Sequence, residues 1–137
     1  MKTLLLSLLS IGALVAAEPA KPAVVRPGRA LEAPGVRADF LIQSDRKATV
    51  TFVDEAGKPV ARGERTVTVK VDGKDVALEP QPNGFITKDP LPTKEPAPIV
   101  VQIRAKADAK PANFRLTLDT SLCGGCKRQE YGCICGH

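Results

Sequence analysis

Histidine, tyrosine and tryptophan are scarce in this chain. Tryptophan is absent, and histidine and tyrosine each occur once among 137 residues. With a single histidine, His137 in a glycine-rich stretch, no Ser-His-Asp arrangement on a rigid element is available. No glycine-rich phosphate loop is present, and the acidic residues lie at positions expected on solvent faces or turns, where paired-carboxylate catalysis has no support. These absences predict a binding protein rather than an enzyme.

Long apolar runs are missing, except at the start of the chain. A basic residue, Lys2, precedes an apolar stretch over residues 4–15, and small residues follow at Ala16-Ala17. One positive charge, about a dozen apolar residues and a small-residue exit are typical of a secretory signal peptide over residues 1–17. An uncleaved anchor helix is the alternative, but a membrane span needs about 20 apolar residues. We therefore expect cleavage after this segment, a periplasmic or secreted protein, and no membrane span afterwards.

Charge of one sign is not concentrated anywhere. The chain has 20 Lys and Arg against 15 Asp and Glu, a formal net charge of +5, and the two signs alternate over residues 37–75. A nucleic-acid-binding surface would show basic residues clustered with aromatic ones, and the sequence has no such stripe. We expect no nucleic-acid partner.

The chain that remains after residues 1–17 suffices for one small domain, which we expect to be a monomer.

Prolines gather between residues 18 and 36, at Pro19, Pro22, Pro27 and Pro34. Proline fixes φ, removes a hydrogen-bond donor and pushes the preceding residue into extended geometry. We expect an extended, mostly disordered leader over residues 18–36, which acts as a spacer before the folded domain.

Apolar and polar residues alternate from residue 37 onward. A period of two places successive side chains on opposite faces of a sheet, so each alternating run predicts a half-buried strand. Turn signals separate the runs, at 54–59, at Asp72-Gly73 and at Asn83-Gly84. Six prolines between residues 80 and 98 exclude a central strand there and predict a long crossover between sheets. The expected strands lie at 38–42, 48–52, 66–71, 76–78, 85–87, 99–103 and 114–118.

These strands, with no sustained helical periodicity, predict an all-β fold: a small antiparallel immunoglobulin-like sandwich of about seven strands over residues 37–119. The Cys–Trp–Cys signature of true immunoglobulin domains is absent, and a partly open β-barrel is the rival architecture.

Three segments carry a resemblance to known proteins. The run 49–60 with its Asp-Glu-Ala-Gly-Lys-Pro turn, the run 66–80 and the closing strand 112–118 resemble bacterial exported immunoglobulin-like modules. More narrowly, they resemble small periplasmic β-sandwich proteins associated with heavy-metal efflux. The resemblance covers residues 37–119 and implies the sandwich scaffold. The His- and Gly-containing opening of the efflux group is missing here, and the cysteines lie outside the resemblance.

Cysteine is absent from residues 1–122, and every cysteine lies in the C-terminal tail, residues 120–137. The tail reads Cys123-Gly-Gly-Cys126, six further residues, Cys133-Ile-Cys135, Gly136 and His137. A Cys-x2-Cys turn brings two sulfurs to one metal, because the Gly124-Gly125 pair allows a tight backbone path. A second pair completes a tetrahedron if the backbone turns around Ile134. We expect Tyr131 and Ile134 to cover this site or to dock on the sandwich.

The tail predicts a site for zinc or Cu(I), held by Cys123, Cys126, Cys133 and Cys135, with His137 as a spare or alternative ligand. Thiolates suit both ions, and a neutral imidazole serves zinc or copper. Positive charge at Lys127 and Arg128 is expected to lower the thiol pKa values. The predicted function is metal handling, with a metal ion and an envelope protein as partners.

Three alternatives stay open for the same four cysteines. An exported protein could join them as a two-disulfide knot in a structural or interaction module, although such bridges fasten the tail only to itself. The Cys-Gly-Gly-Cys spacing also fits thiol redox work, but without the helix that such sites need. Four thiolates could hold an iron–sulfur cluster as well.

Overall fold

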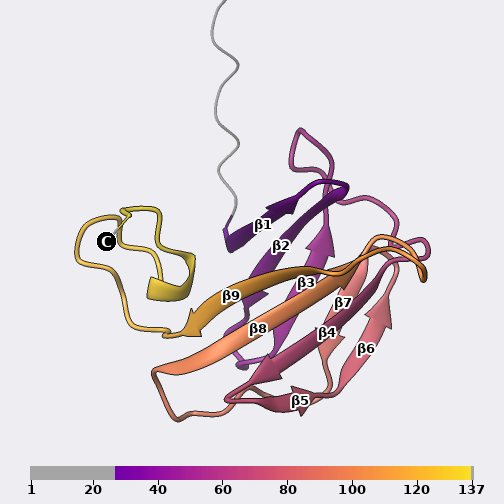
Figure 1. Ribbon diagram of the computed structural model, residues 1–137. Helices are drawn as coiled ribbons and strands as arrows, with labels where there is room; N and C mark the ends of the chain where they lie inside the picture. Colours follow the sequence, from indigo (N-terminus) through magenta and orange to yellow (C-terminus); the bar gives the residue numbers. More distant parts are fainter. Residues whose placement is uncertain (1–26, 137) are drawn as a thin grey trace, which may run out of the picture.

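Two antiparallel sheets pack face to face in the computed structural model, which describes residues 27–136 (Figure 1). The five-stranded sheet has the order β1 (Arg29–Ala33), β2 (Val36–Ile42), β3 (Ala48–Phe52), β7 (Gly84–Thr87) and β6 (Leu78–Gln81). The four-stranded sheet has the order β5 (Lys74–Val76), β4 (Thr66–Val71), β8 (Ala97–Arg104) and β9 (Ala112–Leu118). A short 3-10 turn, η1 (Glu130–Gly132), follows in the tail. The predicted all-β fold of two antiparallel sheets with a cysteine-rich tail is confirmed.

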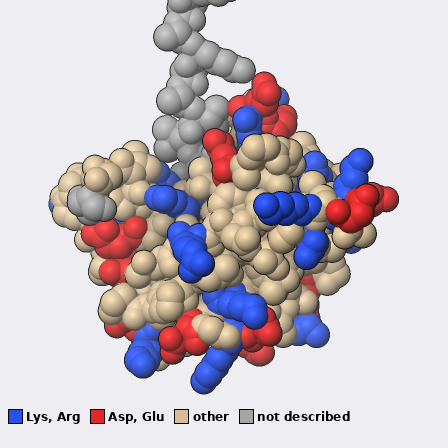
Figure 2. Space-filling model, in the orientation of Figure 1, with Lys and Arg blue, Asp and Glu red and all other residues tan. Residues whose placement is uncertain are grey.

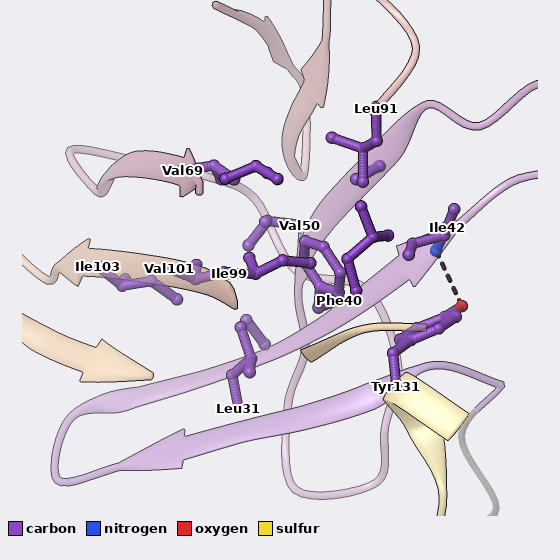
Figure 3. Packing of buried hydrophobic residues seen from close by; sticks show 14 of the residues in the cluster. Leu31, Phe40, Ile42, Val50, Val69, Leu91, Ile99, Val101, Ile103 and Tyr131 are labelled. Carbon is purple, nitrogen blue, oxygen red and sulfur yellow. Dashed lines mark hydrogen bonds between the residues drawn. The ribbon is translucent and has the colours of Figure 1, made fainter. Parts of the chain in front are cut away.

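The core lies between the sheets and follows the alternation in the sequence. In β2, Ala38, Phe40 and Ile42 are buried while their neighbours are half-buried. In β8, Ile99 and Val101 face them from the other sheet as part of the same buried cluster (Figure 3). Each large apolar side chain buried in this way contributes about 1.5–3 kcal/mol. No helix among residues 27–136 is long and apolar enough to cross a bilayer.

The domain begins earlier than the sequence indicates. Residues 29–33 form β1, which pairs antiparallel with β2, so the expected disordered leader over 18–36 is wrong from Arg29 on. Pro34-Gly35 makes the connecting turn, with Gly35 at a φ of 76°, and Leu31 is buried. The stretch between Pro27 and Pro34 is thus long enough to pair as a strand. Residues 18–26, and the expected signal peptide over 1–17, lie outside the described residues.

Over residues 27–136, nine strands replace the expected seven. Besides β1, the run expected at 76–78 divides at Ala77 into β5 and β6, which belong to different sheets. Pro80 lies in β6, at the edge of its sheet, where a missing N–H costs nothing. The expected crossover at 80–98 is shorter than predicted, because it begins after β7 and ends at β8. The exclusion of a central strand from this range is wrong, because β7, which contains no proline, lies between β3 and β6.

The tail leaves β9 and folds back beside β1 (Figure 1). Its start is held by Glu95, whose carboxylate accepts the Thr120 backbone N–H at 2.8 Å. Arg46 donates to the same carboxylate at 2.7 Å. The Thr120 N–H, and then the Arg46 guanidinium, hold the pKa of Glu95 below its ordinary value against the effect of burial.

Tyr131 then anchors the tail in the core. Its side chain is only 5% exposed, and its ring meets Phe40 edge to face, with ring centroids 6.0 Å apart. The Ile42 backbone N–H donates to the Tyr131 hydroxyl at 2.9 Å (Figure 3). Burial raises the pKa of this hydroxyl, although the Ile42 N–H opposes the change. One side chain therefore supplies both packing and a buried hydrogen bond between tail and sandwich.

Replacement of Tyr131 by Phe keeps the ring and removes the hydroxyl. We expect the free energy of unfolding to fall by about 1–3 kcal/mol, because the buried Ile42 N–H loses its acceptor. Urea unfolding of the two proteins, followed by circular dichroism, measures the difference. An unchanged free energy of unfolding would contradict the anchoring role of the hydroxyl.

Candidate metal centre

The first two cysteines lie in a short loop closed by backbone hydrogen bonds. The Cys123 N–H donates to the Arg128 carbonyl at 2.7 Å, and the Lys127 N–H donates to the Cys123 carbonyl at 3.0 Å. Leu122 and Gln129 form a bridge just outside these bonds. The chain reverses after Cys126 because Lys127 takes a left-handed conformation, with a φ of 60°. The loop therefore holds the Cys123 and Cys126 side chains on the same side.

The two glycines of this loop have different roles. Neither takes a left-handed conformation. The tight turn that was expected to need these glycines is instead made by Lys127, which has a positive φ. A Cβ on Gly125 would lie 3.1 Å from the Cys135 sulfur and 3.8 Å from the Cys123 sulfur. A Cβ on Gly124 would meet nothing within 4 Å. Gly125 thus makes room for the sulfurs, whereas Gly124 has space to spare.

The second pair of cysteines follows η1. The Cys133 N–H donates to the Glu130 carbonyl at 3.1 Å, and the Cys135 N–H donates to the Cys133 sulfur at 3.3 Å. The chain turns around Ile134, as the Cys-x-Cys spacing requires, and both sulfurs reach the first pair. Ile134 itself is 72% exposed, so the expectation that it covers the site or docks on the sandwich is wrong. Tyr131 alone of the two docks.

All four sulfurs converge. Each lies within 4.8 Å of every other. The Cys133 sulfur is 3.4 Å from that of Cys123 and 3.7 Å from that of Cys126, and the Cys135 sulfur is 3.7 Å from that of Cys123. Four sulfurs at about 2.3 Å from a tetrahedral metal are about 3.8 Å apart. A disulfide needs about 2.05 Å, and the four cysteines are thiols here. The cluster could thus hold a metal, or close disulfides after the sulfurs approach.

Two arginines attach the cluster to the start of the sandwich. Arg29 of β1 donates to the Cys133 carbonyl at 3.1 Å, and Arg128 donates to the Gly28 carbonyl at 2.9 Å. Gly28 must be glycine, because a Cβ there would lie 2.1 Å from the Phe40 carbonyl oxygen.

Elsewhere, Lys and Arg are interspersed with Asp and Glu over the face shown in Figure 2. His137 lies outside the described residues, so its role as a ligand stays a prediction.

Hydrogen bonds give the thiols unequal acidity. The backbone N–H groups of Arg128 and Ile134 donate to the Cys126 sulfur and lower its pKa to about 6, although burial opposes them. The largest cause is the Arg128 amide; the sequence suggested the side-chain charge instead. The Cys135 thiol keeps its proton in hydrogen bonds to the sulfurs of Cys126, Cys133 and Cys123, and these bonds raise the pKa of Cys135 to about 12. For Cys133, the Cys135 N–H favours the thiolate, but burial and the neighbouring thiols outweigh it and raise the pKa.

Comparison with protein families, curated proteins and solved structures found no match to this chain. The inference of function therefore rests on the fold and on the geometry of the cysteine cluster.

Metal-free, reduced protein should react with iodoacetamide first at Cys126. Its thiolate forms with a pKa of about 6, so its alkylation rate should reach half of its maximum near that pH and level off above it. Cys135 provides the internal control: it is the more exposed thiol, but its pKa is raised to about 12. Peptide mapping after short exposures across a pH series gives both rates. Faster modification of Cys135 at neutral pH would contradict this assignment.

Proposed function

We propose that this chain is an exported metal-binding protein, in which four tail thiolates hold one zinc or Cu(I) ion on a β-sandwich, and that it takes part in metal handling. The observation that carries the proposal is the convergence of all four sulfurs within 4.8 Å of one another. The described part of the chain, residues 27–136, holds all four thiol ligands of this set. His137 would be a spare or alternative ligand.

The spacing of the sulfurs supports one shared centre over two separate pairs. The Cys133 sulfur has neighbours from both Cys123 and Cys126 at 3.4 and 3.7 Å, and Cys123 also has Cys135 at 3.7 Å. A two-disulfide knot would choose one partner for each sulfur and separate the pairs. Tetrahedral coordination by four sulfurs is typical of zinc or an iron–sulfur site, and thiolates also suit Cu(I). The metal would supply the positive charge that stabilises thiolates at this centre.

The metal would also order the tail. Among the described tail residues, the buried side chains are those of Cys123, Tyr131 and Cys133, so apolar packing alone provides little stability there. Coordination replaces protons on the thiols and couples the ligands to one another. Because Arg29 links this segment to β1 and Arg128 links it to Gly28 just before β1, metal binding would also fasten the start of the sandwich.

Export and the envelope location rest on the signal-like residues 1–17 and on the resemblance of residues 37–119 to exported modules. An envelope protein that receives or supplies the metal is the partner we propose. The low pKa of Cys126 is the observation that favours the second candidate, a thiol redox protein. A redox role would require catalytic turnover with a disulfide substrate. A protein that only binds metal would show no such turnover.

Native and denaturing mass spectra of protein purified from an exporting host test the main proposal. We expect the native mass to exceed the denatured mass by one zinc or copper ion, and four thiols to be titratable after chelation. A metal-free protein whose mass shows the hydrogen loss of two disulfides would overturn metal binding and leave the structural knot.

Gly125→Ala should weaken metal binding, and Gly124→Ala serves as the matched control. The new Cβ at residue 125 would press on the Cys135 sulfur at 3.1 Å, at a cost of about 1 kcal/mol, which is about a fivefold loss of affinity. The same change at residue 124 meets open space and should leave the affinity unchanged. Competition with a chromophoric zinc chelator measures both constants. Equal affinities for the two variants would show that the sulfurs gather elsewhere when the metal binds.

A further inference from the structure

The four candidate ligands differ in their access to solvent. Cys123 is 1% exposed and Cys133 is 9% exposed, and Cys126 is partly buried. Cys135 is exposed, as are both of its neighbours in the chain, Ile134 and Gly136. Within the described part of the chain, the centre is therefore most open on the side formed by residues 134–136.

The ligands also differ in how their backbones are held. Cys123 is fixed by hydrogen bonds within its loop, and Cys133 is fixed on both sides, through its N–H to Glu130 and its carbonyl to Arg29. Cys135 has a different kind of attachment, because its N–H donates to the Cys133 sulfur. The Ile134 N–H likewise donates to the Cys126 sulfur. The N–H groups of residues 134 and 135 are thus bonded to the sulfurs themselves, whereas those of Cys123 and Cys133 are bonded to backbone carbonyls.

We propose that Cys135 is the exchange ligand, through which the metal passes between this protein and an acceptor that carries two thiols. This inference rests on the proposed function and deepens it. An acceptor thiol loses its proton and forms a sulfur–metal bond as the bond between the metal and Cys135 breaks. Cys135 takes up the proton, so charge and atoms balance and the metal keeps its oxidation state. Cys126, Cys133 and Cys123 hold the ion during this step, and the second acceptor thiol displaces one of them next.

A dithiol is the acceptor class that this geometry fits. A monothiol that enters at Cys135 leaves the ion with three ligands from this chain, so the ion returns when Cys135 rebinds. A dithiol can continue the exchange, because its second sulfur is already held beside the metal at a high effective concentration. Buried Cys123 offers no comparable entry, since an incoming sulfur would have to displace the chain that covers it.

Alkylation of the zinc-loaded, full mature protein tests the order of ligand release. We expect iodoacetamide to modify Cys135 at least about ten times faster than Cys123, and the singly modified protein to retain zinc in its native mass spectrum. This order differs from that expected for metal-free protein, where Cys126 reacts first. Modification of all four cysteines at one common rate, or of Cys126 first in the loaded protein, would overturn the exchange role. If no zinc is bound, loaded and unloaded samples give the same order, and the proposed function fails instead.

A second measurement uses Cys135→Ser, with zinc transfer to dimercaptosuccinate as the readout. Without a thiolate to displace at the open side, the transfer rate should rise at least about tenfold over the unmodified protein. Cys123→Ser is the control, because it removes a ligand on the buried side. Native mass spectrometry first establishes how much zinc the Cys123→Ser variant binds. An unchanged transfer rate in Cys135→Ser would contradict the proposal, since the rate would then be limited elsewhere.

Discussion

The burial of the Tyr131 ring is the contact on which the arrangement of the tail depends. It joins η1 to Phe40 through an edge-to-face contact and to Ile42 through a hydrogen bond. Since η1 lies between the two cysteine pairs, the position of this ring decides whether the second pair returns to the first. Without this ring, the tail would be held to the sandwich by the polar contacts of Glu95, Arg29 and Arg128, and the second cysteine pair would lose its buried anchor.

The anchor also explains why a small sandwich can present a defined centre outside its core. Arg29 and Arg128 bond carbonyl groups across the junction between tail and β1, so the cluster and the first strand stabilise each other. The result is a graded site: Cys123 is buried, whereas Cys135 is exposed. Such a gradient suits a protein that must hold an ion firmly and still release it to a partner, which is the combination that metal handling requires.

The features that could be predicted from the sequence are those that depend on neighbouring residues. Alternation alone placed Phe40 and Ile42 on a buried face, and the cysteine spacing alone placed four sulfurs in one cluster. The features that could not be predicted depend on distant partners. β1 has a weak pattern and becomes a strand through pairing with β2, and the Tyr131 hydroxyl finds its partner 89 residues away. The role of Gly125 likewise depends on the Cys135 sulfur, which the local sequence does not reveal.

We propose that four sulfurs of this chain surround one metal ion. X-ray absorption at the metal edge, recorded on the zinc-loaded mature protein, tests it most directly. We expect a first shell of four sulfur atoms at about 2.3 Å and no nitrogen or oxygen ligand. A shell with two or fewer sulfurs, completed by oxygen or nitrogen at about 2.0–2.2 Å, would contradict it.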